Sequence, residues 1–232
     1  MRLLAIGDIH GHIRALDALL EEVAPTKSDT VVFLGDYVDK GPSVKETLDR
    51  LCELSNISQW VFLRGNHDQM FLDACLNPAE IGIWECLAGE KPLASYGTGS
   101  TQDLVASIPP THIEFLKDRC QDYFEDSSFI FVHGGIRPHL KPEEEEVYRL
   151  QWMVLSNAAP HLSQKTIICG HSAQSSGLIA DLDHTICIDT GISKGGYLTC
   201  LDLTNSSYIQ ASERGDLRAK ELRRSLIKPI HG

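Results

Sequence analysis

The chain has 232 residues, of which 42% are hydrophobic and 23% charged, the balance of a globular protein long enough to bury a core. Its formal net charge of −11 argues against broad electrostatic binding to nucleic acid or to an anionic membrane surface, although bound metal ions would still attract a phosphate. No apolar run has the length of a membrane span, and the N-terminal residues read as a first strand rather than a signal peptide. The seven cysteines are scattered and form no CxxC pair, so we expect reduced thiols and a cytoplasmic location.

Eight short segments rich in β-branched and aromatic residues are predicted to be strands. In chain order they are Leu3–Ile6, Thr30–Leu34, Trp60–Leu63, Ser128–Val132, Thr166–Cys169, Thr185–Ile188, Tyr197–Leu203 and Ser207–Ala211. Several are apolar on both faces, as expected of strands that are covered on each side. The last two are expected to form a hairpin.

Apolar residues at helical spacing lie between these strands and predict helices near residues 13–23, 44–51, 70–76 and 113–120. The charged segment from Gly215 to Leu226 is predicted to be a terminal helix. From residue 78 to 127 the pattern weakens, and we expect a mostly helical or irregular insertion that roofs a site. No boundary or linker divides the chain, which predicts a single α/β domain over residues 1–232.

Two polar features are expected to be solvated rather than functional. The acidic run Glu143–Glu146 follows Pro142 and suits the exposed start of a helix, although a metal or partner site is the alternative. His12 lies next to the first polar loop and is expected at a solvent-exposed helix start.

Five polar clusters follow predicted strands, each at the point where an apolar run stops. They are Gly7–Gly11 (GDIHG), Gly35–Gly41 (GDYVDKG), Arg64–Asp68 (RGNHD), His133–Gly135 (HGG) and Gly170–His171 (GH). Because binding groups gather at the carboxyl ends of strands in open α/β sheets, five distant loops can meet in one crevice. Their carboxylate, imidazole and amide groups suit Mn²⁺, Fe or Zn²⁺ better than a soft-metal site.

These clusters resemble those of the calcineurin-like metallophosphoesterase superfamily. More narrowly, they are similar to bacterial and phage serine/threonine protein phosphatases of the phosphoprotein-phosphatase type, and to the related symmetrical diadenosine tetraphosphatases. The resemblance runs from Gly7 to Gly191 and includes the stretches FVHGGIRP and IDTGISKGGYLTCLDL. It implies a four-layer β-sandwich flanked by α-helices.

The resemblance also implies two divalent metal ions, with Mn²⁺ expected first and Fe or Zn²⁺ as alternatives. One ion would be held by Asp8, His10 and Asp36. The other would be held by Asp36, Asn66, His133 and His171, so that Asp36 bridges ions about 3.5–4 Å apart. A hydroxide between the ions would attack phosphorus directly, without a covalent intermediate.

Four further residues have roles implied by the same resemblance. His67 would be the general acid that protonates the leaving oxygen, oriented by Asp39. Arg64 and Lys40 would bind the substrate phosphate. A loop hydrogen bond for His67 and a surface salt bridge for Arg64 are the structural alternatives.

Three positions depart from the family pattern. Lys40 stands where arginine is usual and lacks the two-pronged guanidinium. Val154 stands where a Trp-x-Arg segment would carry its arginine, and Arg137 or Arg149 would have to replace it. Asp68 stands where protein phosphatases commonly carry glutamate. The tetraphosphatase branch often has aspartate at this position.

Three functions remain open from the sequence. The leading prediction is a metal-dependent phosphomonoesterase acting on phosphoserine, phosphothreonine or phosphotyrosine in proteins. The second is hydrolysis of dinucleoside polyphosphates, kept open by Lys40, Val154 and Asp68. The third is a metal-binding interaction module without turnover, which the intact metal set and His67 disfavour. The expected partners are phosphorylated proteins or small phosphoesters, with neither nucleic acid nor membrane.

Overall fold

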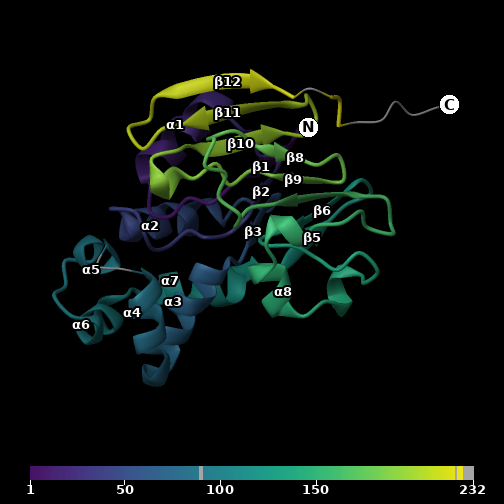
Figure 1. The fold of residues 1–232 in the computed structure, drawn as a ribbon. Coiled ribbons are helices and arrows are strands. Elements are labelled where there is room, and N and C mark those ends of the chain that lie inside the picture. Colours follow the sequence, from purple (N-terminus) through teal and green to yellow (C-terminus); the bar gives the residue numbers. More distant parts are fainter. Residues whose placement is uncertain (89–90, 223, 227–232) are drawn as a thin grey trace.

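The computed structural model describes residues 1–88, 91–222 and 224–226, and within them the strands form two sheets (Figure 1). The larger sheet has the order β12 (Leu217–Glu221), β11 (Ser207–Ala211), β10 (Leu198–Asp202), β1 (Leu3–Ile6), β2 (Thr30–Phe33), β3 (Trp60–Leu63) and β4 (Cys120–Gln121). The smaller has the order β5 (Tyr123–Glu125), β6 (Phe129–Val132), β7 (Thr166–Cys169), β9 (Thr185–Cys187) and β8 (Ala180–Asp181). All eight predicted strands are confirmed, with ends shifted by at most one residue.

Parallel pairing runs through the part of each sheet that carries the polar clusters. Strands β1 to β4 are mutually parallel, as are β6, β7 and β9. The carboxyl ends of β1, β2 and β3 therefore lie along one edge of the larger sheet, and those of β6 and β7 along one edge of the smaller sheet.

The helices are α1 (Ile13–Val23), α2 (Val44–Leu54), α3 (Asn66–Leu76), α4 (Ile81–Ala88), α5 (Lys91–Ser95), α6 (Thr101–Ser107), α7 (Pro110–Glu114) and α8 (Val147–Trp152). Single turns occur at Pro78–Glu80, Phe115–Arg119, Pro142–Glu144, Leu155–Asn157 and Ile192–Lys194. None of the described helices is long and apolar enough to span a membrane.

Three apolar clusters separate four layers, which confirms the predicted sandwich. Side chains alternate between faces along a strand, so Leu4 of β1 packs toward the layer of α1 and α2 while Ala5 packs between the sheets. In the smaller sheet, Phe131 joins the cluster between the sheets, whereas Ile130 packs with Leu150 of α8. Both sheets are thus covered on both faces, as their largely apolar strands require.

The predicted insertion is mostly helical, as expected, but its end is not. Helices α4 to α7 lie together below the sheets in Figure 1. Cys120–Gln121 then extends the larger sheet beside β3, and Tyr123–Glu125 extends the smaller sheet beside β6. These two short strands were missed because two or three residues carry no readable alternation.

The predicted terminal helix is wrong. Within that segment, Leu217–Glu221 forms β12, which pairs antiparallel with β11 in the register Ile209↔Ala219. Gly215 adopts φ 90° in the turn between the two strands. Pairing with the open edge of β11 gives the backbone N–H groups partners, and this outweighs the helix propensity of the charged residues.

Of the two features expected to be solvated, His12 is buried, and the acidic run is exposed as expected except at Glu145. Within the acidic run, Glu145 is 7% exposed and accepts hydrogen bonds from the Arg137 guanidinium at 2.7 and 2.9 Å. His12 is also 7% exposed, with its Nδ1 3.0 Å from the carbonyl oxygen of Ile9. The short helical turn after Pro142 that the sequence predicts is present at Pro142–Glu144.

Candidate metal centre

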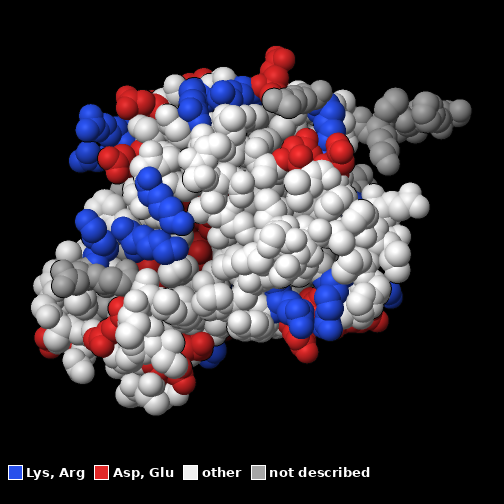
Figure 2. All heavy atoms as spheres, in the orientation of Figure 1, with Lys and Arg blue, Asp and Glu red and all other residues white. Residues whose placement is uncertain are grey.

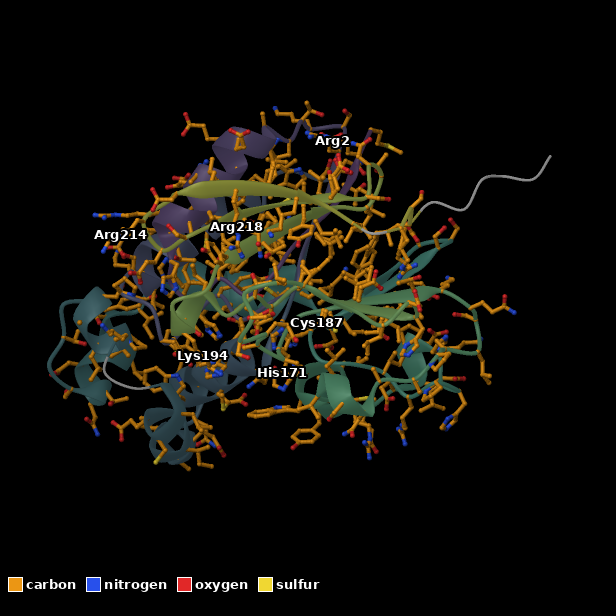
Figure 3. All side chains as sticks on the ribbon, turned by 45° about the horizontal axis from the view of Figure 1, so that its top comes forward. Arg2, His171, Cys187, Lys194, Arg214 and Arg218 are labelled. Carbon is orange, nitrogen blue, oxygen red and sulfur yellow. The ribbon has the colours of Figure 1, made fainter. Side chains whose placement is uncertain are left out.

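The five polar clusters all follow the carboxyl ends of strands, and the structure brings them together. Asp8 and His10 follow β1, Asp36 follows β2, and Asn66 opens α3 after β3. His133 and His171 follow β6 and β7, and His171 lies beside α8 (Figure 3). Strand order, rather than proximity in sequence, therefore assembles the candidate ligands.

Asp36 occupies the middle of this assembly. Its ligand atoms lie within 4.8 Å of those of His10 and His67, and also within 4.8 Å of those of Asp8 and His133. Oδ2 of Asp36 is 3.4 Å from Nε2 of His10, and Oδ1 is 3.3 Å from Nε2 of His133. One carboxylate thus faces two groups of donors, as a bridging ligand would.

Asn66 completes the second group of donors. Its Oδ1 lies 3.0 Å from Nε2 of His133 and 3.0 Å from Nδ1 of His171. Asn66 is 2% exposed and His133 is fully buried. Amide oxygen and imidazole nitrogen therefore converge on one point from three different loops.

The ring orientation of the histidines suits metal binding. Nδ1 of His10 lies 2.8 Å from the carbonyl oxygen of Val38, and Nδ1 of His133 lies 2.8 Å from that of Leu34. A backbone carbonyl at Nδ1 fixes the proton there and leaves the Nε2 lone pair directed inward. Burial also lowers the pKa of His10 to about 3, which keeps the imidazole neutral as a metal ligand must be.

The carboxylates are buried and crowded together, and this raises the pKa of Asp8. Burial first, and then the charges of Asp189 and Asp36, raise the pKa of Asp8 well above its ordinary value. Buried carboxylates this close repel one another, and divalent cations relieve that repulsion. The donor set, its orientation and its charge therefore fit two divalent ions.

Close backbone approach explains two of the glycines in the clusters. A Cβ on Gly65 would lie 2.1 Å from Oδ1 of Asp36, and one on Gly170 would lie 2.1 Å from Oδ1 of Asp8. Any side chain at either position would displace a candidate ligand. The left-handed region also recurs in the centre, with positive φ at His10, Asp36, Asp39, Lys40 and His171.

His67 lies beside the ligands and is held by Asp39. Its Nδ1 is 2.8 Å from Oδ2 of Asp39, which leaves Nε2 directed elsewhere. Burial opposes protonation of His67, but the carboxylates of Asp36 and Asp39 outweigh it and raise its pKa. The pair has the geometry of an acid and its orienting carboxylate.

The model of the family named "Calcineurin-like phosphoesterase" matches residues 1–194. The chain belongs to the calcineurin-like phosphoesterase family. Its members are metal-dependent hydrolases of phosphoesters, which agrees with the donor set described above. The family and fold expected from the sequence are therefore confirmed.

Curated relatives of this phosphoesterase carry two kinds of name. A bis(5'-nucleosyl)-tetraphosphatase PrpE [asymmetrical] from Oceanobacillus iheyensis is 22% identical over 92% of this chain and 93% of its own length. A symmetrical bis(5'-nucleosyl)-tetraphosphatase from Photorhabdus laumondii is 31% identical over 57% of this chain and 44% of its own length. The serine/threonine-protein phosphatase 2B catalytic subunit A1 of Saccharomyces cerevisiae is 30% identical over 60% of this chain and 22% of its own length.

Solved structures show the same fold at low identity. A candidate diadenosine tetraphosphatase superposes with a TM-score of 0.65 at 19% identity, covering 95% of this chain and 93% of its own. A protein serine/threonine phosphatase from Saccharomyces cerevisiae gives 0.61 at 13% identity, covering 97% and 81%. At these identities the likeness establishes the fold alone.

The two predicted phosphate-binding residues of this phosphoesterase differ in placement. Nζ of Lys40 lies 3.0 Å from Nε2 of His10, a candidate metal-ligating atom. Arg64 instead donates to the carbonyl oxygens of Leu116 at 2.9 Å and of Lys117 and Cys120 at 3.0 Å. Its guanidinium thus binds the backbone near the C-terminal end of the helical insertion. These contacts do not favour phosphate binding.

The candidates to replace the missing arginine are also engaged elsewhere. Arg137 pairs with Glu145 at 2.7 Å, and Arg149 pairs with Glu146 at 3.3 Å. Figure 2 nevertheless shows lysine and arginine side chains gathered on the left of this face, beside a recess where acidic atoms are visible.

Two participants were missed from the sequence. Asp68 accepts backbone hydrogen bonds from both of the loops that carry Asp36 and Asn66. Trp84, in the insertion, donates its indole N–H to Asp39. The position of Asp68 two residues after the candidate ligand Asn66 was a usable signal for a supporting role. Trp84 lies in a segment of weak periodicity and had none.

Proposed function

We propose that this phosphoesterase is a two-metal phosphomonoesterase that removes phosphate from serine, threonine or tyrosine side chains of proteins. The observation that carries the proposal is the position of Asp36. Its carboxylate lies within 4.8 Å of ligand atoms of Asp8, His10 and His133, which belong to the two proposed ion sites. It also accepts a hydrogen bond at 3.0 Å from the backbone N–H of His67. Asp36 would thereby contact both the metal ions and the backbone of the proposed acid, His67.

The residues divide into two ligand sets that share one member. Asp8, His10 and Asp36 would hold one ion, and Asp36, Asn66, His133 and His171 would hold the other. Bound ions would lower the pKa of water and neutralise the phosphoryl charge. Hard oxygen and imidazole donors support Mn²⁺ first, with Fe or Zn²⁺ as alternatives.

The remaining groups act on the substrate. His67 would donate a proton from Nε2 to the leaving oxygen, because its Nδ1 is engaged with Asp39. Lys40 would attract the phosphoryl oxygens, because its Nζ lies beside His10. Loss of either group should slow turnover without removing the ions, which separates their roles from those of the ligands.

Hydrolysis of dinucleoside polyphosphates is the second candidate, and two observations favour it. The match to the tetraphosphatase of Oceanobacillus iheyensis extends over 93% of that protein. In addition, the rings of Tyr148 and Trp152 stack at 5.9 Å, and Trp152 lies edge-on to His171 at 6.0 Å. Tyr148 is 68% exposed and so offers a face on which a nucleobase would stack.

A substrate panel tests the proposal. Purified protein with Mn²⁺ is assayed on phosphoserine, phosphothreonine and phosphotyrosine peptides, p-nitrophenyl phosphate and diadenosine tetraphosphate. We expect phosphopeptide turnover that disappears after chelation and in Asp36→Asn. Faster cleavage of the tetraphosphate would support the second candidate. Absence of turnover on every substrate with every divalent metal would instead indicate a metal-binding module.

A further inference from the structure

The side chain of Trp84 connects the helical insertion to the proposed acid. Trp84 lies on α4, and its Nε1 is 3.1 Å from Oδ1 and 3.3 Å from Oδ2 of Asp39. Trp84 is 2% exposed and Asp39 is fully buried. A neutral donor therefore meets a buried carboxylate that is already engaged by His67.

Both oxygens of Asp39 lie within hydrogen-bond distance of Trp84, but only Oδ2 also meets His67. Oδ2 is 2.8 Å from Nδ1 of His67, whereas Oδ1 accepts a hydrogen bond from Trp84 alone among the described residues. A buried carboxylate oxygen without a donor is costly, and a carboxylate held at one oxygen can rotate. The indole N–H thus satisfies the oxygen that His67 leaves unpaired.

We infer that Trp84 is a positioning residue, which fixes the carboxylate of Asp39 so that Oδ2 orients the imidazole of His67 for proton donation. The inference rests on the proposed acid role of His67. It also gives the helical insertion a role in catalysis, because Trp84 on α4 is the only hydrogen-bond donor to Oδ1 of Asp39 among the described residues.

Packing alone does not account for the indole. Trp84 meets the ring of Phe71 edge-on at 5.5 Å, a contact that any aromatic ring of similar size makes. The N–H group is what phenylalanine lacks. Trp84→Phe therefore keeps most of the packing and removes the hydrogen bond.

The chain contains a matched control. Nε1 of Trp60 is buried and has no hydrogen-bond partner among the described residues. Trp60→Phe thus removes an indole of the same kind, in a core position on β3, without removing a hydrogen bond. Its kinetic constants should equal those of the wild type.

The test uses two aryl phosphates that differ in leaving group, p-nitrophenyl phosphate and phenyl phosphate, with the Mn²⁺-loaded enzyme. For Trp84→Phe we expect kcat on phenyl phosphate to fall by about 10-fold, with KM and metal content unchanged. The loss should be smaller on p-nitrophenyl phosphate, because a good leaving group needs less protonation. In a His67→Asn background, Trp84→Phe should have no further effect.

The outcomes separate this inference from the function on which it rests. If His67→Asn slows turnover but Trp84→Phe does not, the positioning role is overturned and the proposed acid stands. An equal loss on both substrates, or a loss that persists in His67→Asn, would also overturn it. If His67→Asn itself does not slow turnover, the proposed acid role of His67 is wrong, and the positioning role that rests on it is overturned as well.

A spectroscopic measurement covers the case in which Trp84→Phe does not fold. The three tryptophans are labelled with ¹⁵N, and the indole N–H resonances are compared between wild type and Asp39→Asn. A hydrogen bond to a carboxylate shifts one resonance downfield, and that shift should be lost in the variant. Unmoved resonances would overturn the inference.

Discussion

The carboxylate of Asp68 accepts a hydrogen bond at 2.7 Å from the backbone N–H of Asp36, the residue that faces both groups of metal donors. The same oxygen accepts from Gly65 at 2.9 Å, and the second oxygen accepts from Tyr37 at 2.8 Å. One side chain therefore joins the loop after β2 to the start of α3. This arrangement explains why a carboxylate follows the Asn-His pair.

Asp68→Ala should weaken both the fold and the metal centre. The change leaves buried N–H groups without acceptors, and we expect a loss of about 2–5 kcal/mol in the free energy of unfolding. Metal affinity should fall by about 10- to 100-fold, as for other residues that support ligands. Urea unfolding and metal titration measure the two effects. Asp73→Ala, on the same helix, should change neither by more than a small amount.

Asp36→Asn should remove or weaken both ions together, because this carboxylate faces both donor groups. The metal content of the purified variant, measured by inductively coupled plasma spectrometry, should fall well below two ions per chain. His10→Asn serves as the comparison, since His10 belongs to one proposed ion site and should spare the other. Retention of two ions by Asp36→Asn would contradict the bridging role.

His67→Asn should lower kcat by about 10²- to 10⁴-fold while both ions stay bound, because the side chain is proposed to donate a proton rather than to bind metal. The loss should shrink as the leaving group improves. Steady-state kinetics on a series of aryl phosphates checks this dependence. Loss of metal in the variant would show that His67 is a ligand. The side chain of His67 lies close to those of His10 and Asp36, so the metal content is measured together with kcat.

Lys40→Met should raise KM for phosphate esters, because it removes a cation that lies beside the candidate ligand His10. Lys40→Arg should lower KM by about 3- to 10-fold if the guanidinium can take two phosphate oxygens at once. Val154→Arg tests whether the family arginine can be restored in the same way. Unchanged KM values in all three variants would mean that phosphate is held by the ions alone.

Asp29 supplies a prediction on pH and stability away from the centre. Burial alone would raise its pKa, but hydrogen bonds from Thr26 and Arg2 outweigh it and lower the pKa below its usual range. The ionised folded form is therefore favoured, and its contribution is present above about pH 4 and lost as the pH falls further. Asp29→Asn should cost about 1–3 kcal/mol at pH 7, with the difference from wild type narrowing below about pH 4 in urea titrations.

Most of the architecture was predictable because its signals are local. Each of the eight predicted strands is a short apolar run, and each candidate ligand lies within a few residues after one, as Asp8 follows Ile6 by two residues. The prediction of a terminal helix was wrong. The segment from Leu217 to Glu221 has no apolar stripe that a helix could bury, and pairing with the open edge of β11 set its conformation.

The contacts that support the site depended on the fold. Arg64 lies one residue before a glycine of the third cluster, yet its guanidinium reaches carbonyls more than 50 residues away. The hydrogen bond from Trp84 to Asp39 spans 45 residues in the chain. Sequence identifies which side chains can do chemistry, whereas these distant contacts are set by tertiary packing.

The left-handed backbone at the metal centre has a consequence for protein engineering. Residues with side chains rarely adopt positive φ, yet five do so here, namely His10, Asp36, Asp39, Lys40 and His171. Glycine would relax the backbone at each position but would remove a proposed metal ligand or a side chain that serves the substrate. Laboratory evolution for heat resistance alone, without selection for turnover, should therefore discard these side chains early, and a thermostable descendant would be expected to be inactive.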